Sequence, residues 1–191
     1  TGDLFQKLYT KSLEGDPDCG GLLAYGYYSG ENITMLNEGR LAFLRTAESK
    51  FNLANFMKVN LYTSLGAVKM GLDILMDDEK VKVEKIMGHG GFFKTKGVGQ
   101  RYLAAAVGAP VTVMDTASEG GAWGIALLAA YLADKKDGEK LEDFLDNRIF
   151  KELSGETIEP TKEEIDGFNV FMDHYKAGLE IEKSAIEHMK W

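Results

Sequence analysis

Apolar side chains recur at steps of three and four over residues 52–76, which places them along one face of a helix. Asn52 stands before the first of them as an N-cap, and the acidic pair at 77–78 marks the exit. A second helical pattern covers about 97–107, and a third runs from the glycine-bearing turn at 119–121 through residue 132. The central part of the chain is therefore predicted to carry three helices.

Short segments with strand character separate these helices. Residues 20–25 are predicted to form a short buried strand, and residues 81–87 alternate in polarity and are rich in β-branched side chains. A third strand is predicted over 111–114. The order strand, helix, strand, helix, strand, helix requires crossover connections and predicts an α/β layer.

The two ends of the chain are predicted to be helical. Residues 4–14 have mixed helical spacing, and beyond Asp134 the chain is strongly charged, with amphipathic helices over 139–150 and 161–190. Thr161 and Glu164 form the sequence pattern of a capping box. The interpretation we favour is that these helices pack on their own domain, and binding of a partner is the alternative.

Composition narrows the class of protein. The chain has 191 residues, of which 45% are hydrophobic, and a net charge of −8, so it can close a core but repels nucleic acid and anionic membranes. Its one cysteine, Cys19, cannot form an internal disulfide, and the sequence shows no zinc-site spacing. No apolar segment approaches the length of a membrane span. These features predict a cytoplasmic location.

The strongest local signal for chemistry is Gly88-His89-Gly90-Gly91, which lies between a predicted strand and a predicted helix. Glycines there let a ligand approach the backbone, and the amides of the turn point at an anion. The alternative is a turn that uses glycine only to reverse direction. Lys94 and Lys96, close behind, are open to the same two interpretations: phosphate contacts or solvated lysines.

A second glycine-rich site covers 119–126, where small side chains let a helix approach a neighbour or a ligand closely. Trp123 in this segment could stack on a base or fill the core. The segment 91–97 lacks the Gly-Lys-Ser/Thr ending of a phosphate loop, and Phe93 fills the last glycine position of a dinucleotide-binding motif.

Taken in order, these segments resemble the C-terminal domain of the FGGY carbohydrate kinases. That family has a strand, a Gly-Gly-Gly turn, a helix, a Leu-Gly-x-Pro-Val link and an Ala-Leu-Gly-Ala-Ala segment, which correspond here to 88–91, 108–111 and 124–129. The earlier segment 20–31 is similar to the family's strand and its Tyr-Leu-Ser-Gly-Glu turn. The resemblance covers about 20–132.

The resemblance implies an α/β fold of the actin-like, hexokinase-like ATPase type, with an RNase H-like core. Residues 1–133 would form the nucleotide-binding domain without its first hairpin, and 134–191 would form a helical C-terminal extension packed on it. The fold would be completed by an N-terminal kinase domain that is missing from this chain.

By position, the resemblance also implies a set of nucleotide-binding residues. Gly90 and Gly91 would lie against the α-phosphate and adenosine, and Phe92 and Thr95 would line the adenine side. The start of the third helix, Gly120 and Gly121, would lie near the nucleotide.

The family transfers the γ-phosphoryl group of ATP, with Mg²⁺, to a sugar hydroxyl. Its Asp-x-Gly-Thr hairpin, its catalytic aspartate and its second Gly-Thr hairpin have no counterpart here, so we expect no catalytic or metal-binding residue in this chain, and no activity from the chain alone. Of the aspartates present, Asp115 at a strand end is the best candidate for a catalytic base. The simpler interpretation is that Asp115 is an aspartate of a turn, without a catalytic role. The expected sugar is a ketopentose such as xylulose.

The competing class is a non-catalytic, actin-like nucleotide-binding or assembly module. A third interpretation, a flavodoxin-like domain, needs more parallel strands than the sequence offers. A homodimer is left open.

Overall fold

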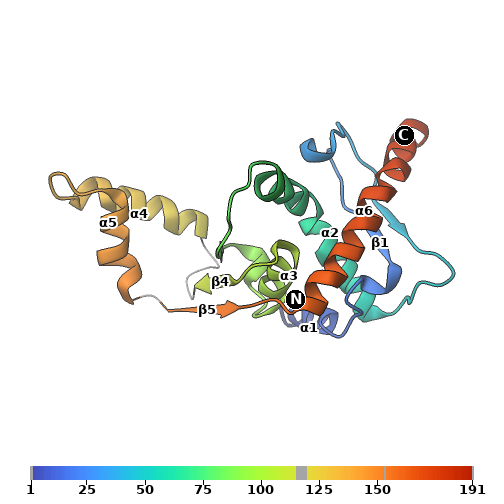
Figure 1. Cartoon of the computed structure of the whole chain (residues 1–191), viewed down its shortest axis with the longest axis horizontal. Coiled ribbons are helices and arrows are strands. Elements are labelled where there is room, and N and C mark those ends of the chain that lie inside the picture. Colours follow the sequence, from blue (N-terminus) through green and yellow to red (C-terminus); the bar gives the residue numbers. More distant parts are fainter. Residues whose placement is uncertain (1, 115–119, 153, 191) are drawn as a thin grey trace.

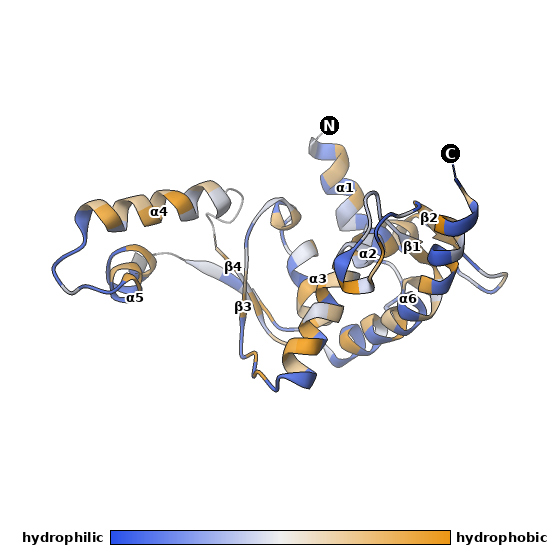
Figure 2. Ribbon diagram, turned by 90° about the horizontal axis from the view of Figure 1, so that it is seen from above, coloured by the Kyte–Doolittle hydropathy of each residue, from blue (hydrophilic) through white to orange (hydrophobic). Residues whose placement is uncertain are grey.

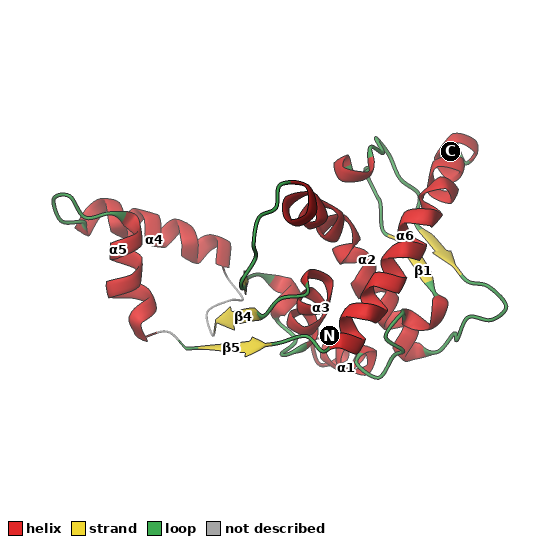
Figure 3. Cartoon of the chain, viewed as in Figure 1, coloured by secondary structure: helices red, strands yellow, loops and turns green. Residues whose placement is uncertain are grey.

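The computed structural model describes residues 2–114, 120–152 and 154–190, and it consists of a compact body with a helical arm (Figures 1 and 3). The α-helices of these described residues are α1 Gly2–Ser12, α2 Leu53–Asp73, α3 Val98–Val107, α4 Gly120–Asp134, α5 Leu141–Phe144 and α6 Lys162–His188. Their strands are β1 Leu23–Tyr25, β2 Ala42–Leu44, β3 Ile86–Gly88, β4 Val111–Met114 and β5 Gly155–Ile158. Shorter helical turns follow α2 over Ile74–Asp78 and α5 over Leu145–Ile149 and Phe150–Glu152.

The helices of the centre lie where the periodicity placed them. Asn52 caps α2 by accepting a hydrogen bond from the Asn55 amide at 2.9 Å. The capping box of α6 is also confirmed, because the Thr161 hydroxyl accepts from the Glu164 amide and the Thr161 amide donates to the Glu164 carboxylate at 2.8 Å. Caps are local contacts, so short-range sequence patterns suffice to find them.

The strands differ from prediction in three ways. β1 pairs antiparallel with β2 in a separate two-stranded sheet, so the predicted strands do not all join one layer. The strand predicted over 81–87 is paired only at Ile86–Gly88, where β3 runs parallel to β4. The region beyond Asp134 is not wholly helical, because β5 pairs antiparallel with β4. Strand pairing joins distant residues, so a local pattern predicts it poorly.

The core lies between α2, α3 and α6. Tyr62 on α2 packs against the rings of Phe168 and Phe171 on α6 at centroid distances of 4.7 and 5.3 Å, and all three side chains are fully buried. Tyr175, one turn further along α6, lies directly against the backbone of Gly66. The segment after residue 134 therefore contributes central core side chains through α6.

Two buried polar side chains of α2, Asn55 and Lys58, hydrogen-bond to the loop after α1. The Asn55 amide group accepts from the Asp16 backbone N–H at 2.7 Å and donates to the Asp16 carboxylate at 2.8 Å. Lys58 Nζ donates to the Gly15 carbonyl at 2.7 Å, and burial lowers the pKa of this lysine. The buried amine thus joins α2 to the backbone of the loop at Gly15.

The arm consists of α4, α5 and the turns that follow α5. Figures 1 and 2 show these helices side by side and away from the rest of the body. They are held together by Tyr131 and Phe144, whose rings are 5.4 Å apart, and by an ion pair of Arg148 with Glu139 at 2.8 Å. Within the described residues, no helix has the length and apolarity needed to cross a membrane.

Candidate nucleotide site

The two parallel strands place both glycine-rich segments at the same end of the sheet, beyond the carboxyl ends of the strands. β3 and β4 pair in parallel register, Ile86 with Val111 and Gly88 with Val113. The turn at 88–91 follows β3, and α4 is the next described element after β4. In open α/β sheets, ligands bind outside the carboxyl ends of the strands. Both glycine-rich segments lie at these carboxyl ends.

The backbone at Gly90 and Gly91 is bare. Gly90 has φ 100° and ψ −175°, a conformation that side chains disfavour, and it precedes the short helical turn Gly91–Phe93. A Cβ added at Gly90 or at Gly91 would meet no atom within 4 Å. Open space therefore lies over both glycines, as a ligand lying on the backbone would require.

The aromatic residues after the turn hold it onto α3. The half-buried Phe92 lies so close to Gly99 that a Cβ there would come within 2.8 Å of its ring, and Phe93 packs in the same way on Gly88. The two phenylalanine rings meet edge to face at 5.5 Å. Thr95 is half-buried, and its carbonyl accepts from the Val98 amide at 3.2 Å at the start of α3.

The structure brings the two glycine segments into contact. The side chain of His89 lies over Gly120, where an added Cβ would come within 2.6 Å of the His89 Cβ. The His89 ring stacks on Trp123 at 6.4 Å, and Trp123 in turn meets Phe150 at 6.0 Å. Gly121 faces open space. Sequence reasoning missed the packing of His89 against Gly120, since the two residues are 31 positions apart and no local pattern links them.

The charged residues near the turn have partners. Lys96 forms an ion pair with Glu156 on β5 at 2.8 Å. This contact links the segment after the turn to β5. Asp115 and Glu119, which the sequence analysis considered, lie outside the described residues.

Comparison with known families identifies the domain. The model of the C-terminal domain of the FGGY family of carbohydrate kinases matches residues 3–133. The chain belongs to the FGGY family. The resemblance inferred from the ordered motifs is therefore confirmed, and so is the α/β fold of the actin-like, hexokinase-like type.

Solved FGGY-type kinases share this fold at low sequence identity. The chain is similar to a xylulose kinase from Rhodospirillum rubrum (TM-score 0.69, 17% identity, 92% of this chain and 33% of that chain). It is also similar to a gluconate kinase from Lactobacillus acidophilus (TM-score 0.70, 16%, 94% and 34%) and to a Plasmodium falciparum glycerol kinase with ADP (TM-score 0.64, 13%, 91% and 33%). The chain thus spans about a third of the length of those kinases. No curated protein matches the sequence significantly.

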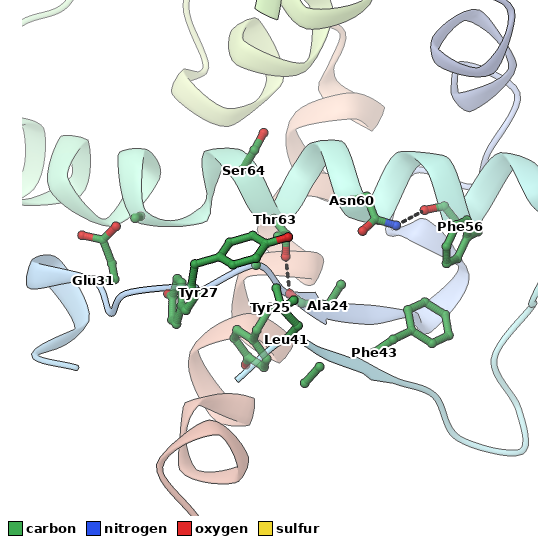
Figure 4. A pocket seen from close by; sticks show the side chains of 14 residues that line it. Ala24, Tyr25, Tyr27, Glu31, Leu41, Phe43, Phe56, Asn60, Thr63 and Ser64 are labelled. Atoms are coloured by element: carbon green, nitrogen blue, oxygen red, sulfur yellow. Dashed lines mark hydrogen bonds between the residues drawn. The ribbon is translucent and has the colours of Figure 1, made fainter. Parts of the chain in front are cut away.

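A separate pocket lies on the other side of this FGGY domain, between the β1–β2 sheet and α2 (Figure 4). It has a volume of about 560 Å³, and its wall includes Phe43 from β2 and Phe56 from α2. Two of its polar side chains are engaged within the wall: Asn60 Nδ2 donates to the Phe56 carbonyl at 2.8 Å, and the Thr63 hydroxyl donates to the Ala24 carbonyl. No pattern in the sequence predicted this pocket, and the pocket is lined by none of the predicted nucleotide-binding residues.

Proposed function

We propose that this domain binds the adenine nucleotide of a carbohydrate kinase, at the edge formed by the turn 88–91 and the start of α4. The observation that carries the proposal is the open space over the backbone of Gly90 and Gly91. A side chain at either position would begin to fill that space. Amides of such a turn can donate to phosphate oxygens at short range. Gly121, also open, would form the facing wall, and Phe92 and Thr95 would support the adenine side from below.

The reaction proposed for the complete protein is transfer of the ATP γ-phosphoryl group to a sugar hydroxyl, with a ketopentose such as xylulose as the substrate. Magnesium supplies charge neutralisation on the transferring phosphates in this class of reaction. Among the described residues, no three carboxylate, histidine or cysteine side chains gather as a metal site. In the complete kinase, we assign the metal ligands and the catalytic base to the N-terminal kinase domain that the family resemblance implies. Within this chain, we assign nucleotide binding to residues 1–133. Residues 134–191 would support that domain because α6 packs on it. We place the protein in the cytoplasm, where ATP is available.

Calorimetry with ATP and ADP on the 191-residue chain tests nucleotide binding. Gly91→Val places a side chain in the open space and should weaken binding at least tenfold. Gly2→Val is a matched control, because an added Cβ at Gly2 on α1 also meets no atom within 4 Å but lies far from β3 in the sequence and on another element. Equal binding by both variants, or no binding by the parent chain, would refute the proposed site.

A coupled assay of ADP release with xylulose tests whether the chain alone catalyses phosphoryl transfer. The chain alone should show nucleotide binding without turnover. Binding without turnover that persists after the missing domain is added would instead favour the non-catalytic nucleotide-binding module.

A further inference from the structure

A further pocket lies between the loop after α1, the helices α2 and α3, and the start of α6. It has a volume of about 370 Å³, and its lining includes Leu13, Pro17, Tyr62, Tyr102 and Ala105. Leu13 is 39% exposed, whereas the two tyrosines and Ala105 are buried, so the pocket reaches from the surface to the core. Pockets that bind small molecules have this size, and a few polar groups in a largely apolar wall orient the ligand.

Lys58 of α2 brings an amine to the wall of this pocket from inside the fold. The residue is only 6% exposed. Its Nζ donates to the Gly15 carbonyl at 2.7 Å and to the Asp16 carbonyl at 3.2 Å. The rings of Tyr62 and Tyr102 have their centroids 5.8 and 5.7 Å from the same atom. A charged amine has one N–H more than these two hydrogen bonds use, so a donor remains for a ligand.

The charge of Lys58 has no counter-ion at ion-pair distance among the described residues. The nearby carboxylates are paired elsewhere: Asp16 lies 2.8 Å from Lys50. Glu164 lies 2.8 Å from Arg101. Burial lowers the pKa of Lys58, and it outweighs the attraction of these more distant carboxylates. Buried charges in proteins are normally paired, so an anion in the pocket would supply the partner that this amine lacks.

The rest of the wall favours an anion with a single charge and an apolar body. The hydroxyl of Tyr102 is already hydrogen-bonded to the Ser12 hydroxyl at 2.7 Å, so its ring is what remains for contact with a ligand. Aromatic and aliphatic walls pack well on an apolar body. The carboxylates of Glu163 and Glu164 also line the pocket, and they would repel a second negative charge.

We propose that this pocket binds a small monocarboxylate with an apolar or aromatic body, and that Lys58 Nζ donates its remaining hydrogen bond to the carboxylate. The ligand would neutralise the buried charge while both hydrogen bonds to the loop at 15–16 are kept. The apolar body would lie against Tyr62, Tyr102 and Ala105. This site goes beyond the proposed nucleotide binding, because it shares no residue with the set assigned to the nucleotide.

Titration of the 191-residue chain with benzoate, followed by proton–nitrogen NMR correlation spectra, tests the site. Saturable shifts should centre on the amides of Gly15, Tyr62 and Ala105, and the amides of Gly90 and Gly91 should not move. Benzamide has the same shape without the charge, so it should bind at least tenfold more weakly. Phenyl phosphate, with its second charge, should also bind more weakly than benzoate. The absence of saturable shifts, shifts centred elsewhere, or equal binding of either analogue would overturn the proposed site.

A pair of lysine variants tests the role of the amine. Lys58→Met removes the charge and keeps an unbranched side chain, and it should weaken benzoate binding at least tenfold. Lys162→Met is the matched control, because its side chain is 86% exposed at the start of α6 and it removes one positive charge from the surface only. Circular dichroism verifies that each variant folds, and the comparison of benzoate with benzamide on the parent chain decides if Lys58→Met does not. Equal affinity of the parent chain and Lys58→Met, or an equal loss in both variants, would refute the assignment to Lys58.

Discussion

His89 and Gly120 lie in van der Waals contact, with the histidine side chain occupying the place that a Cβ at Gly120 would need. This contact fixes the start of α4 beside the glycine turn after β3. It also explains why a glycine is needed at 120, because a Cβ there would come within 2.6 Å of the His89 Cβ and only a backbone shift could relieve the overlap.

Gly120→Ala should therefore move α4 away from the turn. In a Trp191→Phe background, which leaves Trp123 as the reporter, we expect a change in fluorescence emission as its stacking on His89 is lost. Gly121→Ala is the control, since a Cβ there meets no atom within 4 Å. The double variant His89→Gly, Gly120→Ala should give the same spectrum as His89→Gly alone, because the His89 Cβ that the new Cβ would overlap is then absent. An unrelieved change in the double variant would contradict the contact.

Gly66→Ala should destabilise the fold. The added Cβ would come within 2.5 Å of the buried Tyr175 ring, and overpacking of this kind costs about 2 kcal/mol. Gly124→Ala on α4 meets no atom and should stabilise its helix by up to about 1 kcal/mol. Guanidinium unfolding measures both. Equal effects of the same sign would show that α2 and α6 do not meet at this point.

The stability that Asp16 contributes near neutral pH should be lost in acid. Hydrogen bonds from Lys50 Nζ and Asn55 Nδ2, both at 2.8 Å, hold the pKa of this carboxyl below its ordinary value of about 3.9. The folded state thus favours the charged form, and the resulting stability is present above that ordinary value and lost as pH falls through the lower, folded-state pKa.

The matched variant is Asp16→Asn, which keeps the size of the side chain and removes its charge. The free energy of unfolding of the parent chain should exceed that of Asp16→Asn near neutral pH, and the difference should shrink in acid. A difference that stays constant as the pH falls would mean that the charge of Asp16 contributes nothing.

The capping box of α6 gives a further prediction. Thr161→Ala removes the acceptor of the Glu164 amide and should lower the free energy of unfolding by about 1 kcal/mol. Thr161→Ser keeps the hydroxyl and should lie close to the parent chain. Urea unfolding of the three proteins provides the comparison, and indistinguishable midpoints would show that the cap does not limit stability.

Several parts of this protein were determined by short stretches of sequence. The spacing of apolar residues set α2, α3 and α6, and Asn52 and Thr161 set two of their starts, because helices and caps depend on neighbours within four positions. The glycines at 90 and 91 were likewise found from the sequence, since a bare turn between a strand and a helix is a local feature.

Other parts were decided only by tertiary structure. β5 was missed because its pairing with β4 joins residues more than 40 positions apart, where Gln100 Nε2 also bridges the Val111 and Glu156 carbonyls. The strand predicted over 81–87 is short in the fold because residues before Ile86 have no paired strand in the described chain. The contact of His89 with Gly120 depends on the same long-range register. A strand or a site wall becomes defined only when a distant segment supplies its partner, and that choice is made by the whole fold.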